Sequence, residues 1–136
     1  MSVSKDTELS KLPQSFWRLC EIEGIRKTEN VLNEARNKKS VEIFMQHGYS
    51  KIESLHFFCN ITELVIIQQG LSKIENLDSL VNLESLWINE NPLITKIEGL
   101  SNLKQLKRLF LFVFFLLFHI LLPFNILYLS NHIYII

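Results

Sequence analysis

The chain of 136 residues has few cysteines, glycines and aspartates, and these scarcities exclude several kinds of site. Its two cysteines, Cys20 and Cys59, stand far apart with no CxxC pair or Cys/His cluster near either, so we expect reduced thiols of an intracellular protein. Four glycines leave no Gly-rich phosphate loop. Asp6 and Asp78 are the only aspartates, and the histidines stand in unrelated contexts. We therefore expect no catalytic residue, no cofactor and no metal, and hence no enzyme.

The sequence also lacks an excess of charge of either sign. Its 14 Lys and Arg residues balance 14 Asp and Glu residues, and the pI is about 6.9. A nucleic-acid-binding domain needs a basic patch on its surface, so we expect no nucleic-acid partner. No motif points to a small-molecule substrate. The length allows one domain at most.

What the sequence does contain is one unit that occurs three times. The copies are KIESLHFFCNITELVII, KIENLDSLVNLESLWIN and KIEGLSNLKQLKRLFLF, which begin at Lys51, Lys73 and Lys96 and thus lie 73 − 51 = 22 and 96 − 73 = 23 residues apart. A fixed period of this length is typical of a solenoid, in which each turn buries its apolar face against its neighbours. The predicted fold class is α/β, with short parallel strands stacked along a solenoid and a helical cap before them.

Apolar residues stand at matching places in all three copies. They recur first at a spacing of three and then alternate, which predicts a short strand at the end of each copy, over 63–67, 85–89 and 108–112. Stacked copies share one core, whose predicted members are Leu64, Ile66, Leu77, Leu80, Leu83, Leu86, Ile88, Asn91, Leu100, Leu103, Leu106 and Leu109.

Strand residues that point away from the core are predicted to form the functional surface, on the concave face of the solenoid. They make three rows: Glu63, Ser85, Arg108; Val65, Trp87, Phe110; and Ile67, Asn89, Phe112. An outward Trp87 between apolar neighbours has the composition of a hot spot for a protein partner. The alternative is that Trp87 only packs on Val65 and Phe110 across adjacent strands. The partner itself is not identified by these residues.

The residues before the repeats predict a flexible N-terminus over 1–12 and a helical cap over 13–48, which covers the apolar edge of the first repeat. A first helix is predicted to begin near Pro13 and to stop at Gly24. A second is predicted from Thr28, as its N-cap, to Asn37. Its inward side is predicted to carry Val31, Leu32 and Ala35.

A third helix of the cap is predicted over Val41–His47. Ser40 is predicted as its N-cap, and Gly48 ends it. Its side chains Ile43 and Phe44 are predicted to point inward.

The unit KIExL followed by LxxLxxLxL, over about residues 49–112, resembles the leucine-rich repeats. It is similar to the short class of roughly 22 residues that occurs in a regulatory subunit of protein phosphatase 1 and in axonemal dynein assembly factors. This resemblance implies a non-catalytic scaffold that binds proteins in the cytoplasm, including that of the cilium. Members of this class are much longer, so it also implies that the chain is a truncated form holding the opening repeats.

The resemblance also implies a structural role for Asn91. In such repeats an Asn stands three residues after the last core residue of the strand, and its amide bonds the backbone of the turn. Gln69 is an imperfect substitute at this place in the first copy, and Phe114 in the third copy cannot replace it.

After Arg108 no Asp, Glu, Lys or Arg occurs as far as Ile136. One interpretation is a C-terminal transmembrane anchor over Leu109–Leu129, which would make the protein a membrane-tethered adaptor facing the cytoplasm. The other is that residues 113–136 form an apolar, helical tail without a designed role, because the repeat pattern breaks off inside its third strand. The sequence leaves both interpretations open.

Overall fold

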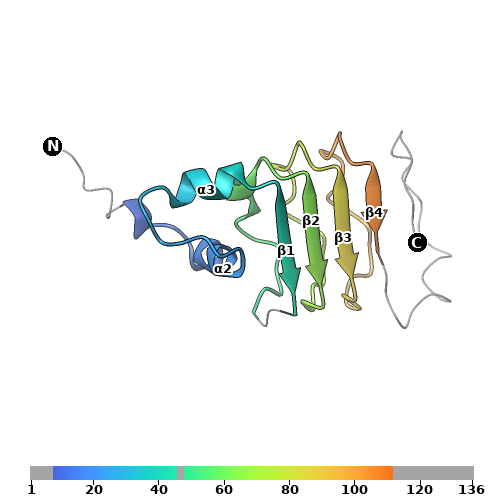
Figure 1. The fold of residues 1–136 in the computed structure, drawn as a ribbon. Coiled ribbons are helices and arrows are strands. Elements are labelled where there is room, and N and C mark those ends of the chain that lie inside the picture. Colours follow the sequence, from blue (N-terminus) through green and yellow to red (C-terminus); the bar gives the residue numbers. More distant parts are fainter. Residues whose placement is uncertain (1–7, 46–47, 112–136) are drawn as a thin grey trace.

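The structure, a computed structural model, describes residues 8–45 and 48–111. Its centre is a parallel sheet whose four strands lie in chain order: β1 (Ser40–Phe44), β2 (Glu63–Ile67), β3 (Ser85–Asn89) and β4 (Arg108–Phe110). The helices α2 (Gln14–Ile22) and α3 (Val31–Asn37) precede the sheet and lie at its β1 end (Figure 1). A short 3₁₀ helix, η1 (Leu55–Phe58), follows β1. The chain therefore winds through about three turns of a solenoid with few helices.

Neighbouring strands pair at equivalent positions of the repeated unit. Glu63 lies beside Ser85, and Ser85 lies beside Arg108. The strands β2 and β3 have the predicted bounds, whereas pairing between β3 and β4 ends at Phe110. The prediction for the end of the third strand, at Phe112, lies outside the described residues.

The part of each unit with apolar spacing three folds into successive tight turns. The N–H of Leu80 donates to the carbonyl of Leu77 at 2.9 Å, and the N–H of Leu83 donates to the carbonyl of Leu80 at 3.0 Å. Residues 100–106 repeat this pattern. Since each turn advances the chain by three residues, every third side chain points to the same side. That side is the interior, which explains why these leucines recur at this spacing.

One continuous core runs through the solenoid. The predicted core residues are all buried in it, none with more than 7% of its surface exposed: Leu64, Ile66, Leu77, Leu80, Leu83, Leu86, Ile88, Asn91, Leu100, Leu103, Leu106 and Leu109. At roughly 1.5–3 kcal/mol for each large apolar side chain removed from water, this stack is the main source of stability. Because it is shared between turns, no turn is stable alone.

The helix α2 has the predicted limits. It begins directly after Pro13, whose fixed φ and missing N–H suit the start of a helix, and it ends before Gly24, whose φ is +66°. The helix α3 begins later than predicted, at Val31, because the Thr28 hydroxyl instead accepts the N–H of Asn30 in the preceding turn.

The predicted inward side of α3 is wrong at one residue. Val31 and Ala35 are fully buried, whereas Leu32 is 38% exposed. Val31 and Ala35 are four residues apart and therefore lie on one face of the helix. Leu32 directly follows Val31 and is rotated from it by about 100° around the helix axis. Leu32 therefore points to solvent.

The predicted third helix, Val41–His47 with Ser40 as N-cap, is wrong. Residues 40–44 form the edge strand β1, in which Val41 and Ile43 are buried while Glu42 and Phe44 are exposed. The inward orientation predicted for Phe44 is likewise wrong, since 43% of its surface is exposed.

Tertiary pairing explains this difference. An isolated helix of two turns is marginal in water. The backbone groups of β2 offer residues 40–44 a complete ladder of hydrogen bonds, with Ser40 beside Glu63 and Phe44 beside Ile67. His47, at the end of the predicted helix, lies outside the described residues.

The helical part of the cap packs on the first turn through aromatic rings. Phe16 of α2 is fully buried, and its ring centroid lies 4.6 Å from that of Phe57 and 6.1 Å from that of Phe58. The hydroxyls of Ser15 and Ser54 are 2.7 Å apart across the same contact. Residues ahead of α2 join this packing, because Leu9 and Leu12 lie partly buried against the core.

No helix in the parts of the chain that the structure describes is long and apolar enough to cross a membrane. Leu109 and Phe110, at the start of the predicted anchor Leu109–Leu129, belong to β4. Leu111 follows β4 and lies partly buried against the core. Residues 112–129 and the predicted helical tail lie outside the described residues.

Candidate partner-binding surface

The strand side chains that point away from the core form one surface, here called the outer sheet face. Its members are Ser40, Glu42, Phe44, Glu63, Val65, Ile67, Ser85, Trp87, Asn89, Arg108 and Phe110. The helices α2 and α3 lie beside β1 rather than across the sheet (Figure 1). This face corresponds to the surface predicted from the sequence, with β1 added to it.

Three members of this surface were missed by the sequence analysis: Ser40, Glu42 and Phe44. The sequence analysis places Glu42 and Phe44 in a helix with Ser40 as its N-cap, although VEIF alternates as a strand does and Ser40 precedes Glu63 by one period, 63 − 40 = 23 residues. That offset was the available signal. The strand register places Glu42 beside Val65, so the middle row of the face reads Glu42, Val65, Trp87 and Phe110.

An aromatic pair lies on the β3–β4 side of the outer sheet face. The rings of Trp87 and Phe110 are stacked, with centroids 3.6 Å apart and planes inclined by 18°. The indole Nε1–H donates to the Ser85 hydroxyl at 3.0 Å. Both rings stay half-buried, while Ser85 beneath them is fully buried. The predicted packing of Trp87 on Phe110 is therefore present, and it holds a partly exposed indole in one orientation.

Apolar surface continues from this pair toward β1. Val65 lies beside Trp87 in the register with 9% of its surface exposed, and Ile67 is half-buried. Phe44, the partner of Ile67 on β1, is exposed, as is Met45 directly after it. Phe44 and Met45 are thus the exposed apolar residues on this side, and adjacent exposed apolar residues favour a binding surface.

Charged groups flank the apolar surface on two sides. Glu42 is exposed and Glu63 is half-buried, and the register makes them diagonal neighbours on β1 and β2. Arg108 is exposed on β4. Within residues 8–45 and 48–111, none of these three side chains takes part in an ion pair. Their charges are therefore available to groups outside this part of the chain.

The free edge of β1 is closed by a side chain from the cap. One carboxylate oxygen of Glu23, Oε1, accepts the backbone N–H of Glu42 at 2.8 Å, and the other, Oε2, accepts from Lys38 Nζ at 2.7 Å. Lys38 Nζ also donates to the Glu23 carbonyl at 3.2 Å. A pocket of ≈ 440 Å³ lies at this edge, lined by Ile22, Glu23, Lys38, Ser40, Glu42 and Phe44.

Asn91 supports the surface from below. Its Oδ1 accepts the N–H groups of Gln69 at 3.0 Å and Leu71 at 3.1 Å, and its Nδ2 donates to the carbonyls of Ile66 and Asn89. These bonds tie the turn after β2 to the turn after β3, as expected for this residue. Gln69 makes one such bond, from Nε2 to the carbonyl of Ile67, and its Oε1 is buried without a partner. Phe114 lies outside the described residues.

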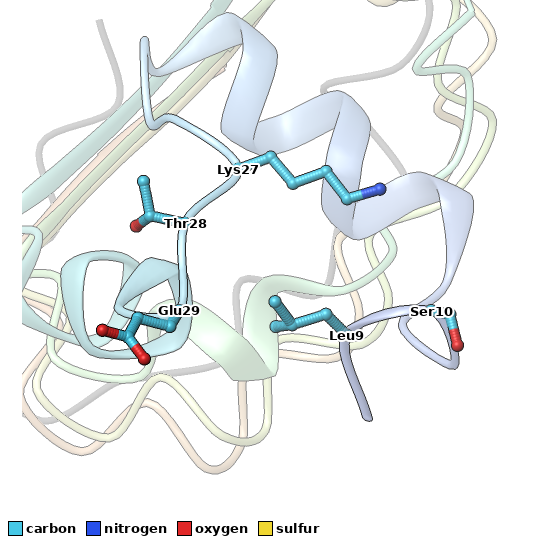
Figure 2. A pocket seen from close by; sticks show the side chains of 5 residues that line it. All are labelled: Leu9, Ser10, Lys27, Thr28 and Glu29. Atoms are coloured by element: carbon cyan, nitrogen blue, oxygen red, sulfur yellow. The ribbon is translucent and has the colours of Figure 1, made fainter. Parts of the chain in front are cut away.

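A second pocket, of ≈ 290 Å³, is lined by Leu9, Ser10, Lys27, Thr28 and Glu29 (Figure 2). In Figure 2 the side chain of Lys27 extends away from Thr28 and Glu29. Its ammonium lies 4.9 Å from the ring centroid of Trp17, so its charge is directed to the indole. The polar side chains do not converge on one point, and this pocket offers no constellation for chemistry.

The described residues contain no group of His, Cys, Asp and Glu that could hold a metal ion. Cys20 and Cys59 are free thiols. Burial, with a smaller contribution from Glu34, raises the pKa of Cys20 to about 11, so this thiol stays protonated near neutral pH. Burial likewise raises the pKa of Tyr49, whose hydroxyl donates to the carbonyl of Glu53 at 2.7 Å.

Comparison of the chain with protein-family models and with curated proteins finds no match. The surface is therefore interpreted from its own geometry.

Proposed function

We propose that this protein is a non-catalytic interaction module built on leucine-rich repeats, and that its outer sheet face binds a protein partner. The observation that carries this proposal is the stacked pair of Trp87 and Phe110, held by the bond to Ser85 on a sheet face that α2 and α3 leave open. An ordered aromatic side chain offers a large contact area and loses little entropy on binding. Such side chains supply much of the energy of protein interfaces.

Two features support the assignment to leucine-rich repeats: the three-residue turns that bury aligned leucines, and the amide of Asn91 that joins successive turns. The proposal extends the resemblance of the stretch SVEIFMQHGYSKIESL to the N-terminal part of leucine-rich repeat-containing protein 9. A scaffold role in the cytoplasm, including that of cilia, belongs to the same proposal.

Site-specific photo-cross-linking in cells tests the proposed surface. The photoreactive residue p-benzoylphenylalanine replaces Arg108 on the outer sheet face or, as control, Val81, which is 53% exposed in a turn away from the sheet. We expect a defined cross-linked protein from position 108 and none from position 81. Adding Trp87→Ala to the position 108 variant should reduce the yield of the cross-linked protein roughly tenfold, because this substitution removes the indole from the aromatic pair.

Val81→Ala is the matched control for the loss of an exposed apolar side chain and should leave the yield unchanged. Equal cross-linking from both positions, or a yield that Trp87→Ala does not alter, would contradict a partner on this face. Thermal unfolding of each variant verifies that the fold is retained.

The second candidate function is a membrane-tethered adaptor. It is favoured by one observation, the absence of Asp, Glu, Lys and Arg after Arg108. To test the membrane anchor, the full chain is synthesised in the presence of microsomes with a glycosylation acceptor appended after Ile136. A chain that stops at Leu111 is the comparison. Glycosylated product that resists alkaline extraction, obtained only with the full chain, is the result expected of an anchor, and unglycosylated product excludes it.

A further inference from the structure

The outer sheet face differs chemically between its two sides, and this difference bears on which partner it suits. Toward β4 it presents the stacked rings of Trp87 and Phe110. Toward β1 it presents Glu42 and Glu63, diagonal neighbours on adjacent strands. Like charges on neighbouring strands repel each other. A cation between these two carboxylates relieves that repulsion and is attracted to both of them.

The pocket at the edge of β1 adds a place for the stem of a basic side chain. Its walls include the apolar side chains of Ile22 and Phe44, and Glu42 lies at the same opening. Lys38 also lines the pocket, but its ammonium is bound to the carboxylate of Glu23 at 2.7 Å, which neutralises it. Lysine and arginine bury an aliphatic stem while their charged end stays at a polar rim. A pocket in which two apolar side chains lie beside the Glu42 carboxylate suits such a side chain.

The spacing of the strands sets the distance between the two subsites. The distance between β1 and β3 is two strand spacings, or roughly 10 Å. An extended peptide advances about 3.3 Å per residue, so about three residues span this distance. We infer, on the basis of the proposed function, that the partner is a protein segment with two anchors. A lysine or arginine enters the β1 pocket beside Glu42, whose diagonal neighbour Glu63 adds a second negative charge. An apolar side chain about three residues away packs on Trp87 and Phe110.

The chain's own residues 112–136 do not have this chemistry, because they contain no Lys or Arg. A partner protein that supplies the cation is therefore favoured over the tail as the occupant of this face.

Selection from a random linear peptide library displayed on phage, with the full-length chain as bait, tests the inference. We expect enriched peptides with Lys or Arg about three positions from a large apolar residue. Binding of these peptides should fall roughly tenfold with Trp87→Ala, and by a similar factor when Glu42→Lys and Glu63→Lys are combined. Added salt should weaken the binding, since the charged contact lies near the surface.

The matched control combines Glu53→Lys and Glu98→Lys, which changes the net charge equally at exposed positions away from the strands. This double variant should bind the selected peptides as the unchanged chain does. Equal loss in both double variants would show attraction by net charge and overturn the inference.

The remaining outcomes separate this inference from the proposed function. Peptides that depend on Trp87 but show no basic residue overturn the two-anchor motif and leave the face as a binding surface. Peptides that are indifferent to Trp87, or no enrichment at all, also overturn the motif, while the cross-linking experiment decides the proposed function independently.

Discussion

Single residues that join adjacent turns contribute to this fold out of proportion to their size. Asn91 is fully buried, yet each half of its amide has two hydrogen-bond partners. Buried polar groups are tolerated when they are satisfied and costly when they are not. Asn91 thus supplies hydrogen-bond partners to backbone groups that would otherwise have none in the turns between strands.

Replacing Asn91 with alanine removes all four bonds and leaves the N–H groups of Gln69 and Leu71 buried without an acceptor. We expect the free energy of unfolding to fall by roughly 3 kcal/mol, measured by urea denaturation. Asn82→Ala, at an exposed position, should change it by less than about 0.5 kcal/mol. Similar losses in both variants would contradict the role assigned to Asn91.

A left-handed residue recurs at the same place in every unit. Ser54, Asn76 and Gly99 have φ values of +60°, +58° and +72°. The Asn76 amide donates to the carbonyl of Ile52 in the preceding turn at 2.7 Å. At Gly99, a Cβ atom would lie 2.6 Å from the carbonyl oxygen of Ile74. Position 99 thus has two requirements: a left-handed backbone, which Ser54 and Asn76 also adopt but glycine adopts without strain, and space for the preceding turn, which a Cβ atom would block.

A pair of glycine variants separates these two requirements. Gly70 has a similar φ, +69°, but no atom lies within 4 Å of an added Cβ, so Gly70→Ala should cost only the roughly 1–2 kcal/mol of the left-handed conformation. Gly99→Ala should cost at least about 1 kcal/mol more, because it also meets the carbonyl of Ile74. Urea denaturation measures both, and equal costs would exclude an effect of the close contact.

At the scale of elements, the first strand and the cap depend on each other. β1 is an edge strand, and an exposed strand edge invites pairing with another chain. The Glu23 carboxylate occupies this edge through the N–H of Glu42 and is itself fixed by Lys38. The cap thus covers the first turn with Phe16 and closes the sheet edge with Glu23.

Glu23→Ala should expose this edge. We expect the Glu42 amide to exchange its hydrogen roughly tenfold faster, because a hydrogen bond to a charged acceptor is lost. Exchange measured by NMR or mass spectrometry tests this. Glu21→Ala removes the exposed ion pair with Arg18 on the same helix and should leave the exchange at Glu42 unchanged. Unaltered protection in Glu23→Ala would mean that the edge bond does not contribute to the order of β1.

For the whole molecule, a solenoid transmits stability only between neighbours. The cap contacts the first turn, and each later turn contacts the next through paired strands and the shared core. A destabilising substitution at one end should therefore lower the stability of the nearest turn most and that of the farthest turn least.

Phe16→Ala tests this expectation. Phe16 is fully buried against Phe57 and Phe58, so we expect a loss of about 3–5 kcal/mol. Hydrogen exchange should accelerate most in β1, less in β2 and least in β4. Leu32→Ala, at an exposed helix position, should cost under about 1 kcal/mol. Uniform acceleration across all strands would instead indicate one cooperative unit.

The sequence by itself determined the solenoid, because its evidence is local and repeated. Every third apolar residue marks a tight turn, and alternation marks a strand, so β2, β3 and the start of β4 followed from spacing. The role of Asn91 followed from the resemblance to leucine-rich repeats. The outward rows across these three strands followed as well, since strand side chains alternate between two faces.

Only the tertiary structure decided what residues 40–44 become. Their local pattern suits a short helix or a strand, and pairing with the edge of β2 selects the strand. With β1 in place, Glu42 and Phe44 join the outer sheet face, and Glu23, distant in sequence, closes the edge of the sheet. The indole of Trp87 gained a fixed orientation for the same reason, because Phe110 and Ser85 meet it only once the strands are side by side.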